Sequence, residues 1–365
     1  MTDDPSDHRQ VVLHIWYPSA SGGKPARYID IDAADPLFQR SYRFMGAENL
    51  LQIRTNSSAD AKPLPGHYPV IIFSHGLGMV SRLYSAFNEN LASHGYVVVG
   101  VESPYFSSAF RLPNGTLVYN QSRMQAAPDA MKSQVRKDEG AIQAQDLVFT
   151  LNQLAKLERS DPILRDHMDL TKVGVFGHSR GGFAAPHACY LDPRFRACLN
   201  LDGYELTQEV TDKGLDQPYM HIQEQFPWDP PPTDEELRQA KQTREQANAE
   251  IRQMAKQWDD TFHRMRSGAW VVTVAGAQHN NFSDAAFDAP DHYKTTRADA
   301  ARVLKITNAY LLAFFDRYLK GRQSALLTKA PPYRGVSLDI YRPGKPGTVH
   351  LETKPGAVTN TPRAR

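Results

Sequence analysis

The chain has 365 residues, 41% hydrophobic and 22% charged, a composition typical of globular proteins rather than disordered or fibrous ones. Its 42 basic and 40 acidic side chains leave a net charge of +2, so there is no basic excess to bind a phosphate backbone. No run approaches the roughly 18 apolar residues that a membrane span requires. We therefore expect a globular protein without a nucleic-acid partner.

Short apolar runs predict strands at residues 11–17, 70–73, 97–101, 172–176, 197–201, 218–222 and 270–274. Most are continuously apolar, which is typical of strands buried on both faces. Helical patterns lie between them, at about 83–95, 133–158 and 297–319. Alternating strands and helices predict an α/β fold with a mainly parallel central sheet flanked by helices, and with residues 11–17 on an antiparallel edge.

Residues 226–267 interrupt this alternation. Apolar side chains recur there every three or four residues, which predicts one long helix or two shorter ones, inserted before the last predicted strand. The charges of the segment nearly balance, whereas a membrane-surface helix favours a basic polar face. We expect the insertion to pack over the rim of the sheet as a possible lid, with peripheral membrane contact as the less favoured alternative.

The two ends of the chain and its cysteines carry weaker signals. Residues 1–4 are acidic and lack signal-peptide features, which predicts a cytoplasmic protein if Met1 is the native start, and a secreted or periplasmic one if a signal peptide was trimmed. Residues 342–365 are rich in Pro, Gly and Thr and are expected to be extended or disordered, within a single domain spanning 1–365. Cys189 and Cys198 are expected to be reduced core thiols.

The segment Gly177-His178-Ser179-Arg180-Gly181 matches the pattern G-x-S-x-G. It follows a predicted strand and precedes a helix start rich in small residues, the setting of a nucleophile elbow. The glycines permit the tight turn, and the following helix N-terminus favours negative charge developing near the serine. Ser179 is therefore the candidate nucleophile.

A serine hydroxyl needs a base within hydrogen-bond reach, and the base needs an orienting acid. His279 follows the predicted strand 270–274, and a loop at that end of the sheet can reach the elbow. For the acid, Asp202 ends the strand 197–201 and Glu224 follows the next strand. Local pattern favours Asp202 because Gly203 stops the strand sharply, but it leaves Glu224 open.

Two backbone N–H groups must stabilise the oxyanion that this chemistry creates. One is expected from Arg180, directly after the nucleophile. The other is expected from Leu77, because residues 75–78 (HGLG) form a glycine-containing loop after an early strand. No His/Cys cluster or metal-binding spacing stands out, so we predict neither a metal nor another cofactor.

Several of these motifs, in this order, resemble the platelet-activating factor acetylhydrolases of the plasma and intracellular isoform II group. The resemblance covers roughly residues 10–320. It rests on residues 16–18 (WYP), 73–78 (FSHGLG), 91–98 (LASHGYVV), 177–182 (GHSRGG), 192–196 (DPRFR), 201–204 (LDGY) and 278–284 (QHNNFSD). It implies an α/β-hydrolase fold and metal-independent cleavage of carboxylic esters. It also implies Ser179 as nucleophile, Asp202 as acid, His279 as base, and Leu77 and Arg180 at the oxyanion positions.

The substrate stays open between short-chain acyl esters, including acetylated phospholipids, and the broader esters of a carboxylesterase or polyester hydrolase. The family usually has an apolar residue where this chain has Arg180, which suggests that Arg180 pairs with a substrate anion. Candidate residues for an apolar substrate site are Tyr105, Phe106, Trp228 and Phe282. A hypothesis of another class is a non-catalytic binding protein on the same fold. The oligomeric state is not predicted.

Overall fold

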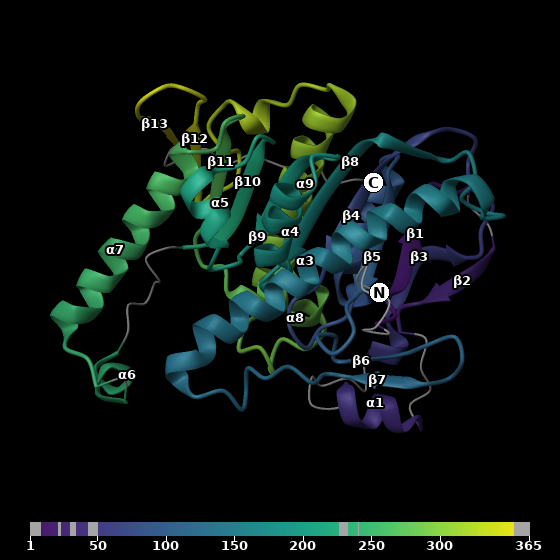
Figure 1. Cartoon of the computed structure of the whole chain (residues 1–365), viewed down its shortest axis with the longest axis horizontal. Coiled ribbons are helices and arrows are strands. Elements are labelled where there is room, and N and C mark those ends of the chain that lie inside the picture. Colours follow the sequence, from purple (N-terminus) through teal and green to yellow (C-terminus); the bar gives the residue numbers. More distant parts are fainter. Residues whose placement is uncertain are drawn as a thin grey trace.

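The computed structural model describes residues 9–20, 23–29, 34–42, 50–225, 233–239 and 241–353. Within these residues, nine strands form one sheet in the order β1-β5-β4-β8-β9-β10-β11-β12-β13 (Figure 1). The six strands from β5 to β11 run parallel, and β1, β12 and β13 pair antiparallel at the two edges. The strands are β1 (Val12–Trp16), β4 (Tyr68–Ser74), β5 (Val97–Glu102), β8 (Met168–His178), β9 (Phe195–Leu201), β10 (Tyr219–Glu224), β11 (Ala269–Val274), β12 (Val336–Tyr341) and β13 (Thr348–Glu352).

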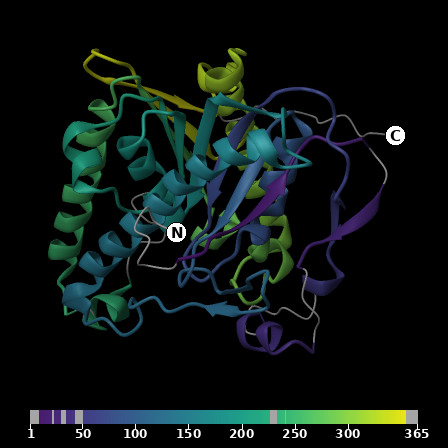
Figure 2. The same ribbon diagram turned by 45° about the vertical axis from the view of Figure 1, so that its right-hand side comes forward.

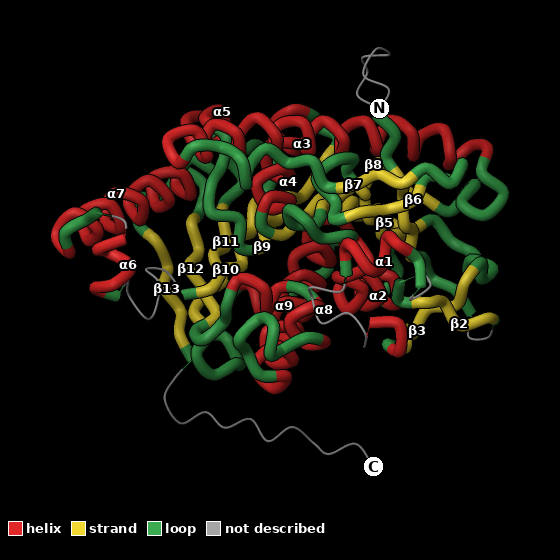
Figure 3. The backbone as a smooth tube through the Cα atoms, turned by 90° about the horizontal axis from the view of Figure 1, so that it is seen from below, coloured by secondary structure: helices red, strands yellow, loops and turns green. Residues whose placement is uncertain are grey.

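Helices cover both faces of this sheet, so the molecule has three layers (Figure 3). One face carries α3 (Asp129–Ser160), α4 (Arg180–Leu191), α5 (Gln208–Lys213) and α7 (Arg244–His263). The other carries α2 (Ser85–Ser93), α8 (Asp284–Asp288) and α9 (Arg297–Lys320). Short 3-10 helices are η2 (Leu50–Gln52), η3 (Ser81–Tyr84), η4 (His279–Phe282) and η5 (Ala325–Leu327).

Peripheral elements complete the described chain. They are α1 (Pro36–Ser41), α6 (Asp234–Gln239), a ribbon of β2 (Lys24–Arg27) with β3 (Arg54–Ala59), and a ribbon of β6 (Ala109–Arg111) with β7 (Leu117–Tyr119). Among the described helices, none combines the length and apolarity needed to cross a membrane.

Strand β4 shows why the central strands are continuously apolar. Its side chains alternate between two buried clusters, because successive residues of a strand point to opposite faces. Ile71 and Phe73 join the cluster under α2 and α9, whereas Val70 and Ile72 join the one under α3 and α4. The prediction of a mainly parallel sheet flanked by helices is confirmed, as is the antiparallel edge strand near residues 11–17.

The long predicted helices are present with slightly wider bounds. The pattern at 133–158 becomes α3, and the pattern at 297–319 becomes α9. Helix α9 begins after Thr296, whose hydroxyl accepts the N–H of Asp299, and ends at Gly321 in the left-handed region with φ 69°. These are the cap and glycine stop that helix ends favour.

The inserted segment contains two helices, α6 and α7, between β10 and β11. Helix α7 lies at the sheet edge formed by β11, β12 and β13 (Figures 1 and 2). The insertion lies directly before β11, the last strand that the sequence predicted, but two further strands, β12 and β13, follow α9 and were not predicted. In the tail from 342, expected to be extended or disordered, residues 348–352 form the paired strand β13, so disorder is wrong for these residues; residues 354–365 lie outside the described part.

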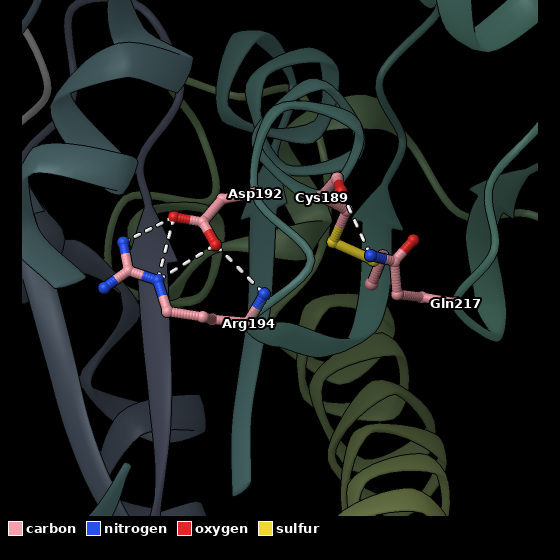
Figure 4. Close-up of a disulfide and its surroundings, with 5 residues drawn as sticks. Cys189, Asp192, Arg194 and Gln217 are labelled. Carbon is pink, nitrogen blue, oxygen red and sulfur yellow. Dashed lines mark hydrogen bonds and ion pairs between the residues drawn. A yellow bond between two sulfur atoms is a disulfide. The ribbon is translucent and has the colours of Figure 1, made fainter. Parts of the chain in front are cut away.

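The expectation of two reduced thiols is also wrong, because Cys189 and Cys198 form a disulfide (Figure 4). Cys189 lies in the last turn of α4 and Cys198 in the middle of β9, and both are buried. The return from helix to strand brings their Cα atoms to 6.5 Å, within the range that a disulfide spans. In the turn between them, Asp192 accepts hydrogen bonds from the backbone and guanidinium of Arg194.

Candidate active site

Ser179 lies in a sharp turn between β8 and α4. Its φ of 57° and ψ of −117° fall in a sparsely populated region for a non-glycine residue, and such strain concentrates at functional sites. The turn is possible only with glycines beside it. A Cβ on Gly177 would come within 2.2 Å of the Gly181 carbonyl oxygen, and one on Gly181 within 2.1 Å of the Ser74 carbonyl oxygen.

Ser179, His279 and Asp202 form one hydrogen-bonded chain. The Ser179 Oγ lies 2.8 Å from His279 Nε2, and His279 Nδ1 lies 2.6 Å from Asp202 Oδ2. The three residues come from different elements: the elbow after β8, the turn after β9, and η4 after β11. The parallel strands end at the same edge of the sheet, and this brings side chains 100 residues apart into contact.

Asp202 is buried and held as a carboxylate. Burial alone would raise its pKa, but the hydrogen bond and charge of His279, with the backbone N–H of Glu224, hold the pKa below its usual value. Glu224, the other candidate acid, contacts the site in another way. Its carboxylate accepts a hydrogen bond of 2.8 Å from the Tyr204 hydroxyl. The structure therefore places Asp202 on the imidazole and Glu224 beside Asp202.

Two aromatic rings contact the imidazole of His279. The Tyr204 ring stacks on it with centroids 4.9 Å apart, and the His178 ring lies tilted against it with centroids 4.7 Å apart. The Tyr204 hydroxyl also lies 3.3 Å from Asp202 Oδ2. These contacts restrict the rotation of the imidazole and keep it aligned between serine and carboxylate.

A chain of buried hydrogen bonds connects the loop after β4 to the backbone of His279. The N–H of Gly76 donates to the Tyr84 hydroxyl at 3.2 Å, and that hydroxyl donates to His178 Nδ1 at 2.8 Å. His178 Nε2–H then donates to the His279 carbonyl at 3.0 Å, and this fixes the tautomer because a carbonyl only accepts. Burial, with the charge of His279, lowers the pKa of His178 to about 3, so the ring is neutral.

The two predicted oxyanion donors lie at suitable places. Helix α4 begins at Arg180, so the N–H of Arg180 has no acceptor within the helix. On the other side, Gly76 packs against Ser179, since an added Cβ there would lie 3.3 Å from the serine Cβ. The amides flanking Leu77 are committed, Gly76 N–H to the Tyr84 hydroxyl and Gly78 N–H to the Phe106 carbonyl at 2.8 Å. Leu77 N–H lies between them.

The buried carboxylate of Glu102 contacts residues on either side of the loop that contains Leu77. Glu102 accepts from the Ser81 N–H at 2.8 Å and hydroxyl at 2.6 Å, from the Ser107 hydroxyl at 3.0 Å, and from His14 Nδ1 at 3.2 Å. His75 Nε2 lies 3.7 Å away. Burial would raise the pKa of Glu102, but His14 and His75 with the Ser81 hydrogen bonds lower it to about 2.

The side chain of Arg180 points into the protein rather than toward a substrate. Its guanidinium pairs with Glu139 of α3 at 2.5 Å, and both groups are buried. The Phe106 ring lies 5.3 Å from the guanidinium carbon. The idea that Arg180 pairs with a substrate anion is therefore wrong, because its charge is already matched by a buried carboxylate.

The predicted apolar substrate residues have different positions. Phe106 adjoins the site through Arg180 and the Gly78 amide, and its neighbour Tyr105 is 39% exposed with φ 70°. Phe282 is fully buried and its ring lies 6.3 Å from that of His178, so it supports the site from within the core. Trp228 lies outside the described residues.

Four supporting residues were not singled out from the sequence: Tyr84, His178, Tyr204 and Glu139. His178 and Tyr204 stand inside motifs that were considered for Ser179 and Asp202, and Tyr84 lies in the helical pattern predicted at about 83–95. Glu139 lies in the middle of a long helix, where a single acidic residue usually faces solvent. The sequence hint to Glu139 is Arg180 itself. If Arg180 is buried after the nucleophile, its charge requires an acidic partner elsewhere in the chain.

The fold and this arrangement define an α/β hydrolase: a largely parallel sheet, a strained serine between strand and helix, and acid and histidine after later strands. The solved structure of a ferulic acid esterase from Streptomyces cinnamoneus is similar, with a TM-score of 0.69 at 26% identity. The match covers 90% of this chain and 89% of that one.

The family model for platelet-activating factor acetylhydrolase, isoform II, matches residues 37–325, and the chain belongs to this family. The platelet-activating factor acetylhydrolase of Canis lupus familiaris is 28% identical over 243 residues, 60% of this chain and 49% of the relative. That of Gallus gallus is 25% identical over 328 residues, 77% and 70% of the two chains. A probable 1-alkyl-2-acetylglycerophosphocholine esterase of Arthroderma benhamiae is 25% identical, covering 71% and 62%. The chain thus spans only about half the length of the dog protein.

Proposed function

We propose that this chain is a serine-dependent hydrolase of carboxylic esters. The observation that carries the proposal is the hydrogen-bonded chain from Ser179 Oγ through His279 to Asp202, built on a strained turn. Membership of a family whose named relatives are acetylhydrolases, and similarity to a ferulic acid esterase, support the same class of reaction.

In the acylation step, Ser179 Oγ attacks the ester carbonyl carbon while its proton moves to His279 Nε2. The N–H groups of Leu77 and Arg180 donate to the oxyanion as the tetrahedral intermediate forms. Asp202 stays ionised and stabilises the imidazolium. The intermediate then breaks its bond to the alkoxy oxygen, which takes the proton from His279 Nε2 and leaves as the alcohol, so that Ser179 carries the acyl group.

Deacylation repeats these steps with water. His279 Nε2 removes a proton from a water molecule as it attacks the acyl carbonyl, and the same two N–H groups hold the second oxyanion. Collapse returns the proton to Ser179 Oγ and releases the carboxylic acid. The contacts of Tyr204 and His178 with the imidazole support both steps, because the imidazole must first receive and then deliver each proton without turning.

The substrate class that we propose is short-chain acyl esters, of which the acetyl esters in the relatives' names are one kind. A broader carboxylesterase, including polyester cleavage, is the second candidate. The similarity to a ferulic acid esterase favours it, since ferulic acid is an aromatic acid rather than a short-chain one.

A chain-length series of p-nitrophenyl esters, run beside an acetylated phospholipid, tests both points with wild type and Ser179→Ala. Ser179→Ala should reduce kcat by about a millionfold, as loss of such a nucleophile does in serine hydrolases. A preference for acetyl and butyryl over longer esters would support the short-chain assignment, and a flat or reversed series would favour the broader enzyme.

The remaining hypothesis, a non-catalytic binding protein, makes the opposite prediction in the same assay. Folded wild type would then cleave no ester above the rate of Ser179→Ala. Circular dichroism of both proteins supplies the control for folding.

A further inference from the structure

A cavity of about 400 Å³ lies between α3, α7 and the segment that follows Asp202. Figures 1 and 2 show α7 and the start of α3 at the same end of the molecule. Helix α7 belongs to the inserted segment, so the insertion supplies one wall. The cavity is lined by Ser133, Arg136, Lys137, Tyr204, Glu205, Leu206, Thr211, Met254, Gln257, Trp258 and Thr261.

The two aromatic walls of the cavity are held in place from outside it. Trp258 stacks on Phe262 with centroids 5.4 Å apart and packs against His221 at 4.9 Å. Tyr204 is fixed by its hydrogen bond to Glu224 and by its stacking on His279. Flat, fixed aromatic walls suit a flat apolar ligand, because little side-chain entropy is lost on binding.

The charge of the lining is positive on balance. It contains two cations, Arg136 and Lys137, and one anion, Glu205. Arg136 pairs with Glu205 at 2.6 Å. In the described part of the chain Lys137 has no carboxylate partner, although it is half-buried. A half-buried ammonium without a partner beside apolar walls is suited to a ligand that supplies the anion.

The cavity adjoins the proposed reaction centre through Tyr204. One face of the Tyr204 ring stacks on the imidazole of His279, and the same residue lines the cavity. A second, smaller space lined by Asp202, Glu224, Tyr204, Met254 and Trp258 shares three of its residues with the cavity. A group bound in the cavity is therefore next to the triad.

We propose that this cavity binds one side of the substrate, and that this side is an aromatic or similarly flat apolar group carrying a single anion, a carboxylate or a phosphate. The anion lies against Lys137 and the flat group lies between Trp258 and Tyr204. The inference deepens the proposed ester hydrolysis and rests on it, since it names the substrate class that the site favours.

The test compares three acetyl esters that differ only in the para substituent: neutral 4-methylphenyl acetate, 4-acetoxybenzoate and 4-acetoxyphenyl phosphate. For each anionic ester we measure its kcat/KM relative to that of the neutral one. Lys137→Met removes the charge and keeps most of the side chain. We expect it to lower this ratio by about fivefold for at least one anion, the effect of a partly buried ion pair.

Two variants serve as controls. Lys137→Arg should restore most of the ratio, because it returns the charge. Lys132→Met lies on the same helix, but its ammonium pairs with Asp129 at 2.7 Å at the exposed start of α3, so all three esters should be unaffected. The anion whose ratio falls identifies carboxylate or phosphate as the preferred group. Unchanged ratios for both anions in Lys137→Met overturn the inference.

Calorimetric binding separates this inference from the proposed function. Wild type, Lys137→Met and Lys132→Met are titrated with 4-hydroxybenzoate, 4-hydroxyphenyl phosphate and neutral 4-methylphenol. We expect at least one anion to bind wild type and to bind Lys137→Met about fivefold more weakly. If no ester is cleaved but the anion binds through Lys137, the proposed function fails and the site stands. If esters are cleaved but no anion binds, the inference fails and the function stands.

Discussion

Helix α4 and strand β9 carry very different structures at their two ends. At the functional edge, which we define as the carboxyl ends of β4, β5, β8, β9 and β11 with the loops that follow, Ser179 and Asp202 both have positive φ and sit in a dense network of buried polar groups. Toward the opposite edge, a disulfide joins Cys189 in the last turn of α4 to Cys198 in the middle of β9. In these two elements, positive φ thus occurs where chemistry is proposed, and a covalent link joins them where it is not.

This contrast predicts that the two edges can be perturbed separately. Changes to the reacting groups at the functional edge should alter turnover more than stability, and removal of the disulfide the reverse. The predictions below test this separation, beginning with the largest effect.

The largest effect is expected from the acid at the functional edge. Asp202→Asn should lower kcat by about ten-thousandfold, because the amide favours the wrong imidazole tautomer and cannot stabilise the imidazolium. Glu224→Gln keeps the acceptor for the Tyr204 hydroxyl and should change kcat by no more than about threefold. Steady-state kinetics on one acetyl ester measures both, and a larger loss in Glu224→Gln than in Asp202→Asn would show that the acid is misassigned.

Glu102 should show that the functional edge also contributes stability. Its pKa in the folded protein is about 2, below the 4.5 of a free glutamate. The ionised Glu102 carboxylate therefore contributes to the free energy of unfolding above pH 4.5, and this contribution is lost as the pH falls through about 2. It amounts to about 3 kcal/mol, the free-energy equivalent of that difference in pKa.

Urea unfolding of wild type and Glu102→Gln between pH 5 and pH 2 measures this effect. Wild type should lose more unfolding free energy over that range than the variant, which has no carboxyl group at this position to protonate. Parallel pH profiles for the two proteins would mean that the buried carboxylate is not held ionised.

The opposite edge should give the reverse pattern. Replacing Cys189 and Cys198 together by Ala removes a cross-link that closes a short loop, and should lower the unfolding free energy by about 2–3 kcal/mol. At 25 °C the kcat of the folded variant should match wild type. A loss of kcat comparable to that of Asp202→Asn would show that turnover and stability cannot be perturbed separately at the two edges.

The smallest effect is expected from the relay that supports His279. Tyr84→Phe removes the hydroxyl between Gly76 and His178, and should lower kcat by about tenfold with little change in KM, as loss of an orienting hydrogen bond does. Phe87→Leu on the same face of the sheet is the packing control. If Tyr84→Phe raises KM and leaves kcat unchanged, the relay does not position the reacting groups.

Much of the fold and of the candidate site could be predicted from local sequence patterns. The elbow is short, and an added Cβ on its glycines would come within about 2 Å of backbone atoms. The five-residue pattern therefore predicts the turn itself. The continuous apolar runs predict the parallel strands because both faces of the sheet are covered. His279 could be placed because parallel strands end at one edge. The same rule fits both Asp202 and Glu224, so the choice of Asp202 as the acid came from the family resemblance.

Other features depend on contacts that spacing does not reveal. The pairing of Cys189 with Cys198 follows from how α4 returns onto β9, and nine residues of separation is compatible with free thiols as well. Arg180 turns inward only because Glu139 of a distant helix meets it. Strand β13 forms because β12 offers it a hydrogen-bonding edge, although the composition of the tail indicated an extended or disordered segment.

The central claim is that Ser179 is a nucleophile activated by His279 and Asp202. Reaction with a fluorophosphonate, followed by mass spectrometry of the digested protein, tests it most directly. Our account predicts one adduct, on Ser179, formed rapidly by wild type and much more slowly by Asp202→Asn. An adduct on another residue, or no adduct on folded wild type, would contradict the account.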